Sequence, residues 1–100
     1  MKQGEVWWAE AEDARRPVLV VTRSEALGVL TGIVVAPVTR SVRGIPTEIP
    51  LGDAEGLPSA CAASFDNLQR IRRSALTEMV GSLGFRGGEI CAALRALADC

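Results

Sequence analysis

The sequence of 100 residues contains no histidine and no tyrosine. Without an imidazole, the chain has no histidine to act as a general acid or base, as a metal ligand or as a switch near neutral pH. Catalytic triads and dyads built on Ser-His or Cys-His pairs are excluded for the same reason. Side-chain chemistry in this protein must therefore come from other groups, above all arginine, carboxylate and hydroxyl groups.

Cysteine and long apolar runs are also scarce. The three cysteines are far apart, at Cys61, Cys91 and Cys100, and without histidine they match no common zinc site. We therefore expect reduced thiols, no metal and no cofactor. The N-terminus lacks the apolar stretch of a signal peptide, and the longest uncharged run, residues 26–39, is too short and too interrupted by glycine and proline to span a bilayer. These features predict a cytoplasmic protein that makes no membrane contact.

The length and composition favour a single domain over residues 1–100. Apolar residues make up 48% of the chain, which is enough to build a core and to exclude disorder. A chain of this size buries only about two thirds of its unfolded surface on folding, so a lone subunit is marginally stable. The size therefore favours a homodimer.

Most of the chain is predicted to form short β-strands. Runs rich in valine, isoleucine, tryptophan and leucine lie between glycine and proline turns at residues 5–10, 17–22, 32–38, 47–51 and 60–65. The run at 17–22 is apolar throughout, which indicates a strand buried on both faces. Pro37 inside the third run predicts an edge or a bulge, because proline donates no ladder hydrogen bond.

Helices are expected at three places. Ser24 can cap a single turn over residues 24–27, and Ser74 can cap a short helix over residues 74–79. In residues 89–98, Ile90, Leu94 and Leu97 fall at i, i+4 and i+7 and predict a terminal helix with one apolar stripe. Strands followed by helices indicate a mainly β fold, a small barrel with appended helices.

The net charge of −1 hides an uneven distribution of charge along the chain. Ten of the eleven basic residues are arginines, whose forked guanidinium suits contacts with phosphate. Residues 14–44 hold five arginines against one glutamate, a net charge of +4. This block favours an anionic partner, for which nucleic acid is the first candidate.

Two polar residues stand at the ends of neighbouring predicted strands. Arg16 directly precedes the proline that opens one strand, and Thr39 follows Val38 at the end of the next. Adjacent strands of a sheet can bring these two side chains together at one rim. A guanidinium beside a hydroxyl can hold a phosphate and stabilise charge that develops on it. The alternative interpretation is that Arg16 is an ordinary surface arginine and Thr39 an ordinary strand-end threonine, and that neither binds a ligand.

The order of several motifs resembles that of the MazF/PemK family of toxin endoribonucleases, the mRNA interferases of bacterial toxin–antitoxin pairs. The motifs are Gly4-Glu5-Val6-Trp7-Trp8-Ala9, Arg16-Pro17-Val18-Leu19-Val20-Val21, Val34-Val35-Ala36-Pro37-Val38-Thr39, Pro46-Thr47-Glu48-Ile49, Asp66-Asn67-Leu68-Gln69-Arg70-Ile71, and a closing segment from Leu76-Thr77 to Gly81-Leu83. The resemblance extends over essentially the whole chain.

This resemblance implies a fold, a reaction and partners. The fold is a small SH3-like, CcdB-like β-barrel with a C-terminal helix, which dimerises and binds single-stranded RNA in a groove. The reaction is sequence-specific cleavage without a metal, in which the ribose 2′-hydroxyl attacks the adjacent phosphate and leaves a cyclic phosphate and a 5′-hydroxyl end. Arg16 and Thr39 match the positions of the family's active residues. The other implied partner is a cognate antitoxin that inhibits growth arrest by the toxin.

Further residues are expected to contact RNA. Asp66 and Asn67 match an acidic-then-amide pair on a strand near the groove, where they can read an unstacked base; a turn-forming pair without a ligand is the alternative. Trp7 and Trp8 alternate between the two faces of a strand, so one is expected in the core and the other at an interface. The remaining residues expected to bind RNA are Arg15, Arg23, Ser24, Arg40 and Arg43.

Two other functions remain open alongside RNA cleavage. The first is a CcdB-like toxin that binds gyrase and has no nuclease activity, and the second is an inactive barrel that only binds a partner. The chain ends Leu97-Ala98-Asp99-Cys100, without the aromatic tail on which CcdB-type toxins depend. The loop of residues 11–15 is shorter than in many members of the MazF/PemK family, so the RNA sequence cut and the antitoxin contacts do not transfer with the resemblance.

Overall fold

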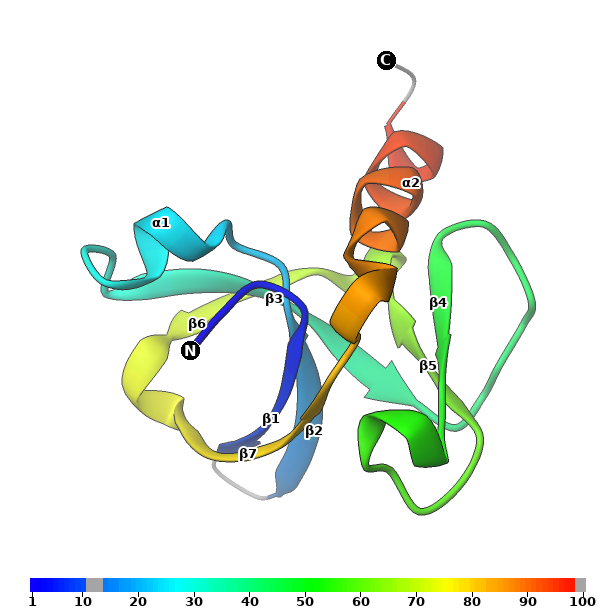
Figure 1. The fold of residues 1–100 in the computed structure, drawn as a ribbon, viewed down its shortest axis with the longest axis horizontal. Coiled ribbons are helices and arrows are strands. Elements are labelled where there is room, and N and C mark those ends of the chain that lie inside the picture. Colours follow the sequence, from blue (N-terminus) through cyan, green and yellow to red (C-terminus); the bar gives the residue numbers. More distant parts are fainter. Residues whose placement is uncertain (11–13, 99–100) are drawn as a thin grey trace.

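The computed structural model describes residues 1–10 and 14–98, so the short loop noted above lies largely outside the described residues. Strands predominate along the chain, short 3₁₀ turns connect several of them, and the longer of the two helices comes last (Figure 1). The strands are β1 (Glu5–Glu10), β2 (Arg15–Val20), β3 (Gly32–Thr39), β4 (Glu48–Leu51), β5 (Cys61–Ser64), β6 (Gln69–Arg72) and β7 (Leu76–Ser82). The helices are α1 (Ser24–Leu27) and α2 (Gly88–Leu97), and the 3₁₀ turns are η1 (Asp53–Glu55), η2 (Phe65–Asn67), η3 (Arg73–Ala75) and η4 (Gly84–Gly87).

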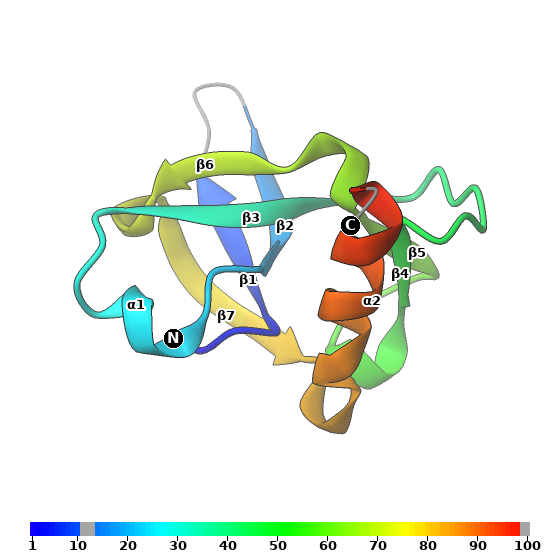
Figure 2. The same ribbon diagram turned by 90° about the horizontal axis from the view of Figure 1, so that it is seen from above.

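The strands join one curled antiparallel sheet in the order β4-β5-β3-β2-β1-β7, and β6 pairs with β3. The long strand β3 has β2 along one edge, whereas β6 and then β5 lie along the other. Figure 2 shows β3 and β6 side by side, with α2 beside the β4–β5 end of the sheet. The expected mainly β fold with a C-terminal helix is therefore confirmed, in the form of a curled half-barrel.

Pro37 lies inside β3 rather than in an edge strand. It faces Val18 of β2, and on the other edge it falls where the partner of β3 changes: β6 pairs as far as Val35, and β5 begins pairing at Val38. A gap between two partners tolerates a residue without an N–H group. The expectation of an edge strand at Pro37 was therefore wrong, although the irregularity that proline signals is present.

The short helix expected at residues 74–79 was also wrong. Arg73–Ala75 make a single 3₁₀ turn without a side-chain cap, and Leu76–Ser82 form β7, which pairs with β1. Pairing with β1 supplies backbone partners that a local helix signal does not take into account. The single turn at Ser24–Leu27 is present, but its N-cap is Arg23 and has no side-chain cap bond.

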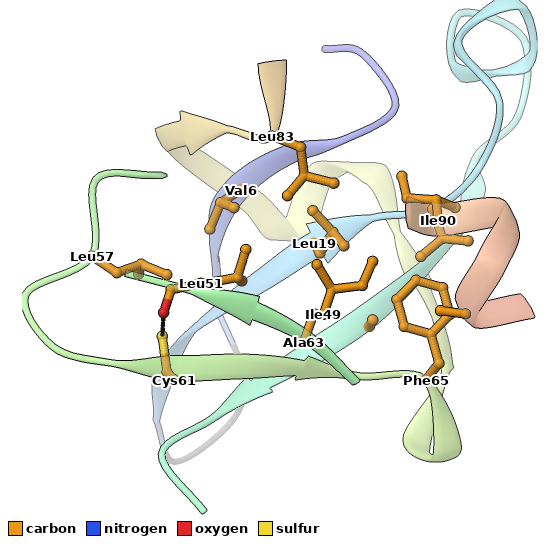
Figure 3. Close-up of a cluster of buried hydrophobic side chains, with 13 residues drawn as sticks. Val6, Leu19, Ile49, Leu51, Leu57, Cys61, Ala63, Phe65, Leu83 and Ile90 are labelled. Atoms are coloured by element: carbon orange, nitrogen blue, oxygen red, sulfur yellow. Dashed lines mark hydrogen bonds between the residues drawn. The ribbon is translucent and has the colours of Figure 1, made fainter. Parts of the chain in front are cut away.

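The sheet buries apolar side chains on both faces, as the apolar run of β2 predicts. On one face the α2 cluster gathers Val6, Leu19, Ile49, Phe65 and Ile90 with their neighbours (Figure 3). On the other face the β7 cluster gathers Ala9, Val18, Val20, Leu27, Ile33, Val35 and Leu76, with Trp7 and Ile71 packed against it. Successive residues of β2 thus enter different clusters, because side chains alternate along a strand.

Helix α2 covers the α2 cluster through the first part of its apolar stripe. Ile90 and Ala93 are buried, and Leu94 packs against the cluster. Leu97, the last residue of the predicted stripe, is 42% exposed. The terminal helix is therefore confirmed, but its packing against the core ends one turn before the helix does.

Arg86 fastens the start of α2 to the turn after β4. Its Nη1 lies 3.0 Å from Oε2 of Glu55, its Nε lies 2.7 Å from Oε2 of Glu89, and its Nη2 donates to the carbonyl of Pro50 at 2.8 Å. Glu55 is buried, and its Oε1 accepts from the backbone N–H of Gly52 at 2.7 Å. The hydrogen bond between Arg86 and Glu89 raises the pKa of Arg86 and lowers the pKa of Glu89. A buried carboxylate is tolerated here because both of its oxygens have partners.

The two phenylalanines provide a matched test of this core. Phe65 is fully buried, whereas Phe85 is fully exposed. Phe65→Ala should lower the free energy of unfolding by about 3–5 kcal/mol, because it removes a large side chain and leaves a cavity. Phe85→Ala should change it by less than about 0.5 kcal/mol. Urea denaturation of both variants measures the two values, and equal effects would contradict the packing described.

Candidate functional site

Arg16 and Thr39 lie at one end of the sheet, where β2 begins and β3 ends. The two strands pair antiparallel with Val18 opposite Pro37, and extending that register by two residues sets Arg16 opposite Thr39. Both side chains then leave the same face of the sheet, since residues two apart on a strand share a face. The expectation that adjacent strands bring this arginine and this threonine to one rim is therefore consistent with the strand register.

Hydrogen bonding leaves both groups available to a ligand. The Thr39 Oγ1 accepts from the backbone N–H of Ser41 at 3.1 Å, so the hydroxyl proton is free to be donated. Arg16 is exposed, and within the described residues its guanidinium has no ion-pair partner. As far as the described residues go, the rim thus presents one hydroxyl donor and one positive charge without an ion-pair partner.

Arg15, the neighbour of Arg16, is engaged within the protein. Its guanidinium carbon lies 5.0 Å from the centre of the Trp8 ring, a cation–π contact. Its Nε lies 3.2 Å from Oε1 of Glu10, and its Nη2 lies 3.1 Å from Oε1 of Glu78. Consecutive arginines on one strand point to opposite faces. Arg15 is therefore paired and held in place, whereas Arg16 has no ion pair with any residue that the structure describes.

A pocket of about 240 Å³ opens beside Thr39, and its lining includes Arg15 but not Arg16. Strands β1 to β3 and the residue after β3 contribute Trp8, Arg15, Pro17, Val38, Thr39 and Arg40 to its lining; the segment that leads into β5 contributes Leu57, Pro58, Ser59 and Cys61. The pocket therefore combines an aromatic ring and two prolines with two arginines and two hydroxyls. Trp8 lines this pocket and Trp7 packs against the β7 cluster, so the two rings leave opposite faces of β1, whereas the expected interface contact of one ring stays a prediction.

Cys61 and the 57–59 loop were not singled out from the sequence. Cys61 is buried at the pocket wall, and its thiol lies 3.7 Å from the carbonyl oxygen of Leu51 (Figure 3). Burial raises the pKa of the Cys61 thiol, and the charge of Glu55 raises it further. No motif marks these residues, because only the folding of the loop after η1 brings them to β1 and β3.

The Asp66–Asn67 pair lies in the 3₁₀ turn η2, so its expected placement on a strand was wrong. The Thr47 hydroxyl donates to Oδ2 of Asp66 at 2.6 Å, and Nδ2 of Asn67 donates to the Ser64 hydroxyl at 2.9 Å. Both side chains are nevertheless exposed, and each keeps an oxygen outside these bonds. The turn is tied to the start of β4, and its polar edge still faces solvent.

The remaining predicted residues do not gather in one place. Arg40 lines the pocket, and Arg43 stands in the loop after β3, which the Glu48 carboxylate organises by accepting from the backbone N–H groups of Arg43 and Gly44 at 2.8 and 3.1 Å. Arg23 and Ser24 lie beyond the other end of β2, so the fold separates them from Arg16 and Thr39. The Ser24 hydroxyl accepts from the backbone N–H of Gln3 at 3.0 Å.

Two other classes of site are absent from the described residues, 1–10 and 14–98. No group of three or more cysteine, aspartate or glutamate side chains there is arranged to hold a metal ion. Within the same residues, no helix has the length and apolar character needed to cross a membrane.

The family follows from comparison with known proteins. Residues 2–97 match the family model described as the PemK-like, MazF-like toxin of type II toxin–antitoxin systems. The chain belongs to this family, which confirms the resemblance read from the motifs.

Individual relatives cover nearly the whole chain. It is 36% identical to the Mycobacterium tuberculosis protein named probable endoribonuclease MazF2, over all of both chains, and 37% identical to probable endoribonuclease MazF5, over 98% of this chain and 93% of that one. The solved Mycobacterium tuberculosis toxin MazF-mt6 is 34% identical and superposes with a TM-score of 0.84, over 93% of this chain and 95% of that one. The chain is thus a toxin of the MazF type, and the expectation of an endoribonuclease agrees with the names of its curated relatives.

The reactivity of the thiols tests the closed wall of the pocket. In a Cys100→Ser background, Cys91 is exposed and Cys61 is buried with a raised pKa. At about pH 8, less of Cys61 is thiolate, so it should react with Ellman's reagent at least about tenfold more slowly than Cys91. Urea should abolish the difference. Equal rates in the folded protein would show that the 57–59 loop does not close over Cys61.

Proposed function

We propose that this protein is a growth-arresting endoribonuclease that cuts single-stranded RNA at specific sequences without a metal ion. The oxygen of the ribose 2′-hydroxyl attacks the adjacent phosphorus, and the bond from phosphorus to the 5′-oxygen breaks. The 2′-hydroxyl loses its proton and the leaving 5′-oxygen gains one, so the products are a 2′,3′-cyclic phosphate and a 5′-hydroxyl end. The proposal is supported by the register of β2 and β3, which sets Arg16 opposite Thr39 when it is extended by two residues, in a member of this family.

Arg16 and Thr39 have different roles in this reaction. The Arg16 guanidinium stabilises the negative charge that builds up on the phosphate oxygens as the 2′-oxygen attacks. The free arginine side chain has a pKa above about 12, so Arg16 is a poor general base and is assigned to charge stabilisation. The Thr39 hydroxyl donates to a phosphate oxygen and orients the scissile group. The Ser41 N–H uses one of the two acceptor lone pairs of this hydroxyl and leaves its proton for donation, which supports a role as donor.

Other residues bind RNA around this centre. Arg40 and Arg43 contact phosphates near the cut, since one lines the pocket and the other stands in the loop after β3. Arg15 contributes a weaker contact, because Glu10 and Glu78 already compensate its charge. The exposed oxygens of Asp66 and Asn67 read the edge of an unstacked base, and Arg23 and Ser24 contact RNA farther from the cut.

The partners follow from the family and the charge distribution. A type II system pairs its toxin with an antitoxin protein, and an endoribonuclease of this fold from a mycobacterial species has been solved with its cognate antitoxin. We infer that the present chain is a cytoplasmic homodimer, inhibited by an acidic antitoxin segment that competes with RNA for the basic rim.

Alanine substitution at the rim tests the proposed centre. Arg16→Ala and Thr39→Ala should each lower the rate of cleavage of a long transcript by about 10²–10³, because each removes one group that stabilises the transition state. Arg95→Ala, at the exposed end of α2, should cleave at the wild-type rate. The measurement is single-turnover cleavage in EDTA, with the new ends mapped.

The mapped ends separate the outcomes of that experiment. Discrete 5′-hydroxyl ends from the wild type support the reaction, and folded dimers of both variants exclude a structural cause. Full activity of Arg16→Ala would contradict the assignment of this residue to the catalytic centre. A wild-type protein that leaves RNA intact would contradict the proposed RNA cleavage and favour a toxin that acts by binding alone.

A further inference from the structure

A second basic surface lies at the other end of β3 from Thr39. A groove of about 830 Å³ opens between the start of β3 and the end of β6. It is lined by Thr31, Gly32, Arg70, Ile71, Arg72, Arg73 and Ser74. The lining thus contains three arginines and two hydroxyls, and no carboxylate. We name this surface the β6 groove.

Strand pairing sets the direction of two of its arginines. Within β6, Ile71 faces Ile33 and packs against the β7 cluster. Arg70 and Arg72, on either side of Ile71, therefore project from the opposite face of the sheet. They pair with Val34 and Gly32 of β3 and are exposed. Two guanidinium groups thus leave one face of one short strand.

Glycine at position 32 leaves room for the guanidinium of Arg70. A Cβ atom at Gly32 would lie 2.5 Å from the Cζ atom of Arg70, so this guanidinium rests directly on the backbone of β3. The third arginine, Arg73, hydrogen-bonds within the protein: its Nη1 donates to the carbonyl of Leu27, and its backbone N–H donates to the carbonyl of Thr31 at 2.8 Å. Arg70 and Arg72 remain for a ligand.

The charges of Arg70 and Arg72 are not compensated within the described residues. The ion pairs there belong to Arg15 and Arg86, and none includes an arginine of the β6 groove. Planar forked guanidinium groups on a concave surface with flanking hydroxyls are suited to phosphate oxygens. A surface of this kind binds the backbone of a single strand without reading its sequence.

We propose that the β6 groove binds the phosphate backbone of the substrate RNA, several nucleotides away from the bond that is cut. This inference rests on the proposed function. Gly32 and Thr39 are the two ends of β3, and seven steps of about 3.3 Å separate them by about 23 Å. The β6 groove therefore acts on long RNA and leaves a short RNA that occupies only the Arg16–Thr39 rim unaffected.

Binding of uncleavable RNA tests the groove independently of catalysis. The probes are fluorescent 2′-O-methyl RNAs of mixed sequence, about 24 and about six nucleotides long, which lack the attacking hydroxyl. Loss of two phosphate contacts on a single strand should lower the slope of log K against log salt by about 1.4, which corresponds to about 25-fold weaker binding at 0.1 M salt. We expect this loss for Arg70→Ala/Arg72→Ala with the long probe, and less than about twofold with the short probe.

Matched variants separate charge from structure. Arg70→Lys/Arg72→Lys should keep most of the salt dependence, because the positive charges remain. Arg95→Ala removes an exposed arginine outside the groove and should leave the slope unchanged. For a cleavable long transcript, the double alanine variant should raise KM with kcat unchanged, since the groove binds ground state and transition state alike.

Each outcome decides for or against RNA binding by the β6 groove. If the double alanine variant has the same slope of log K against log salt as the wild type, the groove does not bind the RNA backbone. A change in the sedimentation coefficient of that variant also contradicts this binding, because the β6 groove would then be an interface between protein subunits. A wild-type protein that binds the long probe with the expected salt dependence but cuts no RNA would retain the groove and overturn the proposed cleavage.

Discussion

The arrangement of β3 is the constraint on which the rest of the structure depends. This strand pairs with β2 on one edge and with β6 and β5 on the other, so it joins both parts of the curled sheet. Its side chains alternate between the two cores: Ala36 lies in the α2 cluster, while Ile33 and Val35 lie in the β7 cluster. A shift of register by one residue would exchange the two faces and place each set of side chains in the core formed around the other. The same register, extended by two residues beyond the pair of Val18 and Pro37, sets Thr39 opposite Arg16.

The elements that could be predicted from the sequence are those whose residues determine their own structure. The apolar run Val18–Val20, the third strand and the periodic helix that starts near Ile90 carry their patterns locally. The strand ends at Arg16 and Thr39 could be located because both residues stand beside such apolar runs, whereas the catalytic roles of these two side chains stay predictions. The structure of the 74–79 segment could not be predicted in this way. Ser74 is typical of a helix N-cap, and only the pairing of β7 with β1 shows that the segment forms a strand.

Surfaces built by distant segments were the least predictable from the sequence. Nothing in the neighbourhood of Pro58 or Cys61 shows that they lie near Trp8, because the turn after β4 brings them there. In the sequence, nothing distinguishes Arg70 and Arg72 from other charged residues; only the pairing of β6 with β3 shows that both side chains lie on one face of the sheet. The identical neighbours Arg15 and Arg16 differ for the same reason, since among the described residues the ion pairs formed from β2 are those of Arg15 with Glu10 and Glu78.

The contact of Arg86 with Glu55 has a dynamic consequence. Glu55 ends the turn that leads directly into Leu57, Pro58 and Ser59, which form one wall of the pocket beside Thr39. Gly81 reinforces this turn, since a Cβ there would lie 2.0 Å from the Glu55 carbonyl oxygen and only glycine lets β7 come so close. Arg86 and Glu55 thus link the first turn of α2 to the pocket wall. Because segments joined in this way tend to open together, we expect their backbone amides to exchange with solvent at similar rates, and a ligand in the pocket to slow exchange at the beginning of the C-terminal helix as well.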